Sequence, residues 1–171
     1  LPKGLPNSEQ VIYVTVDFSH QSLSQQLLAA GFDVTKSTVL TLEGVSQYIT
    51  KEALGSTLDE LKILIQNSNS KLFLSYVDEA FDKDPEVCFG EGYPGAVKRA
   101  NLIKSLSEKV GEPWVSFYSE AEMGDMLSQL GFVIQKNVTL EDLNSLYFGP
   151  VDRTLPEDQI LKLEHLLIAS N

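Results

Sequence analysis

Three carboxylates end or follow apolar stretches of the sequence, where they could bind a ligand. Asp17 ends VIYVTVD, Glu43 ends TVLTLE, and Asp78 follows LFLSYV. A carboxylate is costly to bury without a partner, so an acid at such a position is a candidate binding group. Asp17 could accept a hydrogen bond from an exocyclic amine such as N6 of adenine, with Phe18 against the ring. In the purely structural interpretation, Asp17 caps the following turn and Phe18 packs in the core.

The stretch EGVSQY at residues 43–48 is the most informative of the three. Glu43 looks buried, because β-branched and apolar residues precede it, and a glycine follows it directly. Gln47 and Tyr48 lie just beyond. We interpret this stretch as the rim of a cofactor pocket; the alternative is an acid that is simply solvated at the end of a strand.

Several familiar catalytic motifs are absent from the sequence. It contains no G-x-G-x-x-G, no P-loop and no G-x-S-x-G. Only two histidines, His20 and His165, accompany the single cysteine, Cys88, and they are far apart in sequence. This spacing offers no zinc site and disfavours a catalytic cysteine. A hydrolase is therefore excluded for lack of a recognisable nucleophile–histidine pair.

Five alternating elements position these candidate residues. Apolar and periodic patterns predict, in order, a buried strand at 11–18, a helix at 22–32, a strand at 38–43, a helix capped by Thr50, and a strand at 71–81 with its exit. Strands joined through helices of this length are normally parallel. The carboxyl ends of parallel strands meet at one edge, where α/β sheets bind ligands.

The second half is expected to complete the sheet. Its pattern predicts a loop over the strand ends, a helix at 96–111, a helix at 119–131 opened by a Ser119–Glu122 capping box, a strand at 132–140, a short helix or turn at 140–149, and a strand at 164–169. The predicted class is α/β, with a mostly parallel sheet whose last two strands pair antiparallel.

Length and composition limit the remaining choices. A chain of 171 residues, with 43% hydrophobic and 22% charged residues, predicts a single globular domain over 1–171. A net charge of −11 excludes nucleic acid as a main partner. No apolar run is long enough to cross a membrane, and no signal peptide is visible. One cysteine fits a reducing, cytoplasmic location.

The motif order resembles the leucine carboxyl methyltransferase family, whose members are class I S-adenosylmethionine-dependent methyltransferases. The resemblance is carried by VDF at 16–18, AGFD at 30–33 and EGVSQYI at 43–49. It implies a Rossmann-like methyltransferase sheet and S-adenosyl-L-methionine as cofactor. It also implies that Asp17 and Phe18 contact the adenine, and that Glu43 and Gly44 lie beside the methionine and sulfonium, with Tyr48 nearby.

The resemblance further implies methyl transfer to a nucleophilic oxygen of a carboxylate or hydroxyl acceptor, either a small molecule or a protein. Gln47 and Tyr76 would then line the substrate pocket, and residues 82–118 would form an acceptor-side insertion. No catalytic residue is assigned, because such transfer depends on in-line positioning and desolvation more than on a strong base. No metal is implied.

The chain departs from the family at its amino-terminal side. The family's first strand, glycine-rich turn and ribose-binding acid should all precede Val11, so this chain corresponds to the carboxyl-terminal part only. Two strands should lie between 11–18 and 38–43; without them, either the first predicted strand pairs differently or a sheet edge stays open. A homodimer, or pairing with the missing segment, would close that edge. The alternative function is a non-catalytic α/β module that binds a protein.

Overall fold

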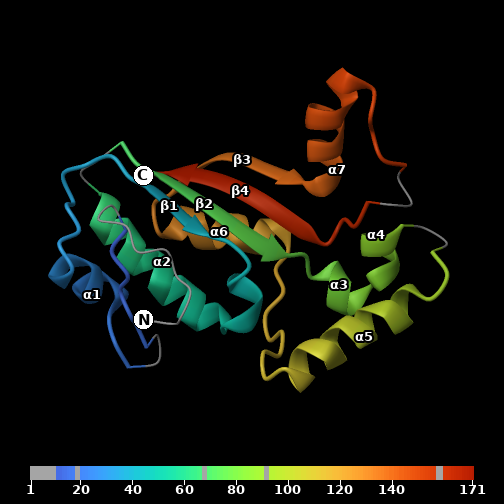
Figure 1. Cartoon of the computed structure of the whole chain (residues 1–171), viewed down its shortest axis with the longest axis horizontal. Coiled ribbons are helices and arrows are strands. Elements are labelled where there is room, and N and C mark those ends of the chain that lie inside the picture. Colours follow the sequence, from blue (N-terminus) through green and yellow to red (C-terminus); the bar gives the residue numbers. More distant parts are fainter. Residues whose placement is uncertain (1–10, 18–19, 67–68, 91–92, 157–159) are drawn as a thin grey trace.

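The computed structural model describes residues 11–17, 20–66, 69–90, 93–156 and 160–171, and its centre is a four-stranded sheet (Figure 1). The strands are β1 (Val39–Leu42), β2 (Lys71–Val77), β3 (Val133–Thr139) and β4 (Glu164–Ser170). Their order in space is β1-β2-β4-β3. β1 and β2 pair parallel, and β4 pairs antiparallel with β2 and β3. The α/β class and the antiparallel last pair are confirmed, whereas a mostly parallel sheet holds only approximately.

Residues 11–17, predicted as a buried strand, form no strand in the structure. Val11 is 45% exposed and Ile12 69% exposed. β1 lies at the edge of the described sheet, and Val39 on it is 70% exposed. A strand needs a neighbour to satisfy its backbone groups, and this segment pairs with no strand of the described sheet. Of the two expected outcomes, the open edge is therefore the one observed.

Two helices pack on one face of the sheet and bury its main core. α2 (Lys51–Ile65) begins after Thr50, whose side chain accepts a hydrogen bond from the Ala53 amide, as predicted. α6 (Glu120–Gln129) begins after Ser119. The short α1 (Leu23–Ala29) packs beside them after its cap, Ser22. The core formed with these helices includes Leu54, Leu58, Leu64, Leu72, Leu74, Tyr76, Met123, Leu127 and Leu167.

A second apolar cluster lies beyond the carboxyl end of β2. It is formed by α3 (Ala80–Lys83), α4 (Pro85–Phe89) and α5 (Ala96–Lys109), which Figure 1 shows beside one another. The pattern had predicted a loop up to residue 95, but two short helices fold there. The cluster buries Val77, Phe81, Cys88, Phe89, Ala96 and Ala100. Residues 82–118, expected as an insertion, thus supply most of this cluster.

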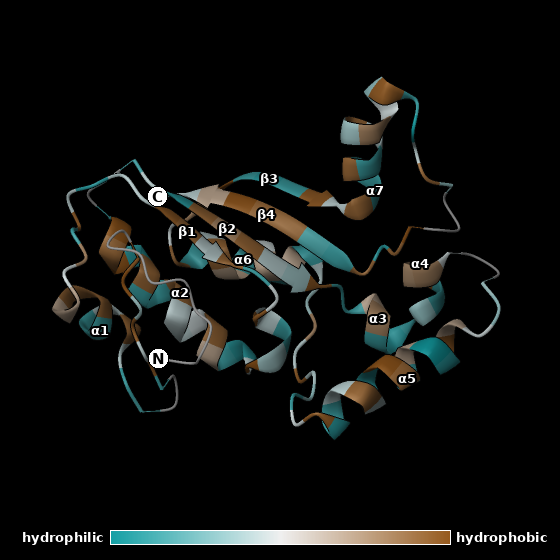
Figure 2. Ribbon diagram, viewed as in Figure 1, coloured by the Kyte–Doolittle hydropathy of each residue, from teal (hydrophilic) through white to brown (hydrophobic). Residues whose placement is uncertain are grey.

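The segment after β3 projects beyond the sheet (Figure 1). It contains α7 (Leu140–Leu143), a single π-helical turn η2 (Asn144–Phe148) and a 3₁₀ turn η3 (Gly149–Val151). Figure 2 shows brown, hydrophobic turns along it. Because β1, β2 and β3 run in the same direction, their carboxyl ends share one edge of the sheet, and this segment starts there. Within the described residues, no helix is long and apolar enough to cross a membrane.

Candidate cofactor and acceptor site

The turn after β1 is held on β2 by one serine. The Gly44 amide donates to Ser75 Oγ over 2.9 Å, and Ser46 Oγ donates to the Ser75 carbonyl over 3.0 Å. Gly44 has a φ of +64°, in the left-handed region, although a Cβ there would meet no atom within 4 Å. The backbone conformation, and not crowding, therefore favours glycine at this position. The turn leaves open space beside Gly44.

That open space belongs to a pocket of about 450 Å³ at the end of β1. It is lined by Gly44, Tyr48, Gly111, Glu112 and Pro113. Tyr48 is 38% exposed, so much of its ring is accessible to a ligand. The pocket has polar and apolar walls in about equal parts and contains one acid, Glu112, which suits a small ligand that carries a positive charge.

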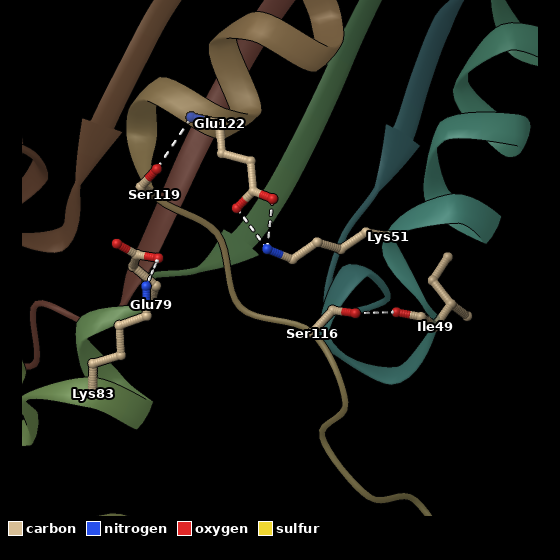
Figure 3. Close-up of polar contacts among 7 residues, drawn as sticks. All are labelled: Ile49, Lys51, Glu79, Lys83, Ser116, Ser119 and Glu122. Atoms are coloured by element: carbon tan, nitrogen blue, oxygen red, sulfur yellow. Dashed lines mark hydrogen bonds and ion pairs between the residues drawn. The ribbon is translucent and has the colours of Figure 1, made fainter.

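A loop that leaves the second cluster forms the far wall of this pocket, and hydrogen bonds fix it to η1 (Ser46–Tyr48) and the residue after it. The Val115 amide donates to the Gln47 carbonyl over 2.7 Å. Ser116 Oγ donates to the Ile49 carbonyl over 2.7 Å, as Figure 3 shows. Trp114 meets the Tyr48 ring edge-on, with centroids 6.4 Å apart. These contacts bring residues 111–116 beside residues 44–49.

Glu43 is exposed at the end of β1, so the burial inferred from its apolar neighbours is wrong. β1 is an edge strand, and among the described residues no strand pairs with it on its outer side. The solvated acid, given above as the alternative, is what the structure contains. A solvated carboxylate beside an open pocket is still available to a cationic ligand.

Asp17 takes part in a turn. Its carbonyl accepts the amides of His20 and Gln21, over 3.0 and 2.8 Å, and its Oδ2 lies 3.0 Å from His20 Nδ1. The Asp17 side chain is 58% exposed. The turn that the structural interpretation expected after Asp17 is therefore present. Phe18 lies outside the described residues, so contact of both residues with an adenine stays a prediction.

The two residues predicted to line a substrate pocket are buried. Gln47 is 7% exposed and contributes its carbonyl to the loop contact described above. Tyr76 is completely buried; its hydroxyl accepts from Asn137 Nδ2 over 2.8 Å, and its ring stacks on His165 at 4.7 Å. Burial raises the pKa of Tyr76 to about 12. Tyr76 therefore belongs to the core, because side chains at alternate positions of β2 face α2 and α6.

An ion pair across the two main helices was not anticipated. Lys51 Nζ lies 2.6 Å from both carboxylate oxygens of Glu122, as Figure 3 shows. It also lies 5.0 Å from the centre of the Tyr118 ring. Ser119 accepts the Glu122 amide over 3.1 Å, so half of the predicted capping box forms. The Glu122 carboxylate faces Lys51. Ser75 was also missed, although one serine inside the apolar run LFLSYV is a visible signal.

Comparison with known proteins finds a family match for the first part of the chain and solved structures with a similar fold. Residues 2–62 match the family model described as leucine carboxyl methyltransferase, which confirms the resemblance inferred from the sequence. The chain is 28% identical over 137 residues to YktD of Bacillus subtilis (strain 168), which carries the name of an S-adenosyl-L-methionine-dependent methyltransferase. The alignment covers 80% of this chain and 41% of YktD, so the chain spans less than half of that relative.

Two solved structures share the fold. A DUF574 family protein from Streptomyces avermitilis MA-4680 superposes with a TM-score of 0.58 at 15% identity, over 93% of this chain and 54% of that one. The mycolic acid cyclopropane synthase CmaA1, solved with SAH and CTAB, gives 0.52 at 13% identity, over 82% and 57%. These likenesses establish the fold of the chain and leave its activity open.

Proposed function

Because residues 2–62 match the leucine carboxyl methyltransferase family, we propose that this chain is part of an S-adenosyl-L-methionine-dependent O-methyltransferase. The acceptor is a carboxylate or a hydroxyl. The observation that carries the proposal is the pocket beside Gly44, at the carboxyl end of a strand in a parallel pair. Open α/β sheets bind their ligands at this edge.

The described residues fit the sulfonium end of the cofactor. Glu43 is an exposed carboxylate directly before the pocket, and the open space beside Gly44 lets a ligand approach the backbone. Tyr48 supplies an aromatic wall, and an aromatic face attracts a cation. In this proposal Asp17 and Phe18 hold the adenine.

When bound, the cofactor supplies an electrophilic methyl group on a positively charged sulfur. The task of the chain is then to position an acceptor oxygen and to exclude water. The loop at residues 111–116 suits both tasks, because its hydrogen bonds to Gln47 and Ile49 hold it rigidly against the turn after β1. The acceptor enters from the side of the helical cluster formed by residues 82–118.

The experiment is a calorimetric titration of the 171-residue protein with S-adenosylhomocysteine, repeated with Glu43→Ala and Asp17→Ala. We expect saturable binding that each substitution weakens about tenfold, equivalent to about 1.4 kcal/mol. Asp59→Ala, an exposed acid on α2 outside the pocket, is the matched control and should bind like the unmodified chain.

Two outcomes contradict the proposal. One is a folded chain, judged by circular dichroism, that shows no binding. The other is equal weakening by Asp59→Ala, which would indicate a general effect of charge. The first outcome favours the non-catalytic protein-binding module, for which the open edge of β1 is the candidate surface.

A further inference from the structure

A second pocket, of about 540 Å³, lies at the foot of the projecting segment. Its walls are almost entirely aliphatic and aromatic; they are Leu140, Leu143, Asn144, Tyr147, Phe148, Leu155, Ile160 and Leu161. Its volume lies in the range of small-molecule sites. Nothing in the function proposed above uses it.

Asn144, the one side chain with a polar amide in this lining, uses both ends of that amide within the wall. Its Nδ2 donates to the Leu155 carbonyl over 3.1 Å, and its Oδ1 accepts the Leu155 amide over 2.9 Å. Asn144 is 7% exposed. The amide therefore ties two parts of the pocket wall together. Because the other lining side chains are apolar apart from the Tyr147 hydroxyl, a polar group would lose its water there with few partners to replace it, and the pocket favours an apolar group.

The pocket adjoins the region expected to hold the acceptor. Leu161, in its wall, also packs against the helical cluster of α3, α4 and α5. The next residue, Lys162, donates its amide to the Cys88 carbonyl over 2.9 Å and forms an ion pair with Glu141 of α7 over 2.8 Å. These contacts hold the projecting segment to the cluster. α7 itself starts at the edge of the sheet that also carries Glu43.

We propose that this pocket binds the apolar tail of the methyl acceptor, and that the acceptor is a carboxylic acid with an aliphatic chain of medium length. The proposal rests on the methyltransferase function proposed above, and it adds the class of substrate. The tail lies between α7 and Leu161, and the carboxylate points along the sheet edge toward the end of β1. Specificity then comes from apolar burial in the pocket, at about 0.8 kcal/mol per methylene.

The test uses decanoate and acetate as probes, titrated into the 171-residue protein by calorimetry without cofactor. We expect decanoate to bind saturably, with a dissociation constant on the order of 0.1–1 mM, and acetate not to bind. In methyl-labelled protein, decanoate should shift the NMR signals of Leu140, Leu143 and Ile160. A negative titration with S-adenosylhomocysteine does not affect this result, so the two proposals can fail separately.

Leu155→Trp fills the pocket from a half-exposed position and should weaken decanoate at least tenfold. Leu140→Trp, at another lining position, should weaken decanoate in the same way and serves as a second variant if Leu155→Trp folds poorly. Leu106→Trp, on an exposed part of α5, is the matched control and should leave binding unchanged. The proposal is overturned if decanoate does not bind, if acetate binds equally, or if Leu106→Trp weakens binding as much. Attachment to phosphatidylcholine vesicles without a saturable decanoate site would overturn it in favour of a membrane surface.

Discussion

Asp78 Oδ2 lies 2.9 Å from His165 Nε2, so this pair of side chains joins the residue after β2 to the start of β4. The other carboxylate oxygen of Asp78 accepts the Ala80 amide over 2.8 Å, at the start of α3. The side chains of Asp78 and His165 are only 24% and 10% exposed. A single carboxylate therefore connects the sheet with the second apolar cluster.

Asp78→Ala should lower the free energy of unfolding by about 1–3 kcal/mol, because it leaves a largely buried imidazole and a helix-starting amide without their acceptor. Urea unfolding followed by circular dichroism measures this. Asp82→Ala removes a more exposed pair with Lys104 and should cost less than about 1 kcal/mol. Equal losses in the two variants would show that Asp78 acts only as a surface charge.

The Lys51–Glu122 pair should give a coupling free energy of about 0.5–1 kcal/mol in a double-mutant cycle with Lys51→Met and Glu122→Gln. Each side chain is 38% exposed, so the coupling should fall in 1 M salt. Lys51→Met alone should be nearly neutral, because a cation in the first turn of α2 opposes the helix dipole. Additive effects at low salt would contradict the pairing.

The burial of Tyr76 should make the free energy of unfolding decrease as the pH rises above 10. Burial raises its pKa to about 12, whereas an unfolded tyrosine loses its proton near 10.0. The unfolded state therefore binds fewer protons in this interval. The stabilisation is complete below pH 10 and is lost as the pH rises through 12, by up to about 2–3 kcal/mol.

Urea titrations at pH 8, 10 and 11 test this, with Tyr76→Phe beside the unmodified chain. The variant should be less stable at pH 8, because Asn137 loses its acceptor, but its stability should fall less between pH 10 and 11. Part of the fall should persist, because burial also raises the pKa of Tyr118. Parallel curves for the two proteins would exclude Tyr76 as the cause.

Cys88 should resist alkylation in the native protein. Burial, with the Asp78 and Asp84 carboxylates, raises the pKa of its thiol to about 12, and the side chain is 1% exposed. The thiolate is the reactive form, so iodoacetamide at pH 8 should modify it far more slowly than free glutathione. In 6 M guanidinium the two thiols should react alike. Rapid native labelling, measured by mass spectrometry, would contradict the buried position.

Helix starts could be predicted from the sequence because a cap is a local arrangement. Thr50 and Ser119 each precede their helix and accept an amide three residues on, as their types and spacing predicted. The strand predicted at residues 11–18 is wrong for the opposite reason: strand formation is not local. Its β-branched residues favour a strand, but a strand forms only when it pairs with a neighbour, and this segment pairs with none in the described sheet.

The site was predictable only in part. The position of Gly44 at a strand end followed from the pattern, but the exposure of Glu43 depends on what flanks β1, which no local pattern reports. β2 has apolar residues on both faces, so the sequence pattern could not show which face Tyr76 lies on or that it faces the helices. Gly111 and Pro113 line the pocket because their loop is bonded to residues more than sixty positions earlier in the sequence. The hydrogen bond from Ser116 to Ile49 is an example.

The two hydrogen bonds between Asn144 and Leu155 have a consequence for solvent exchange. The Leu155 side chain is 49% exposed, yet its amide is held by a buried carboxamide oxygen. Deuterium can replace that amide proton only when Asn144 releases it, and this release opens the wall of the larger pocket. The exchange rate of one backbone amide thus reports how often the pocket opens, in the absence of any ligand.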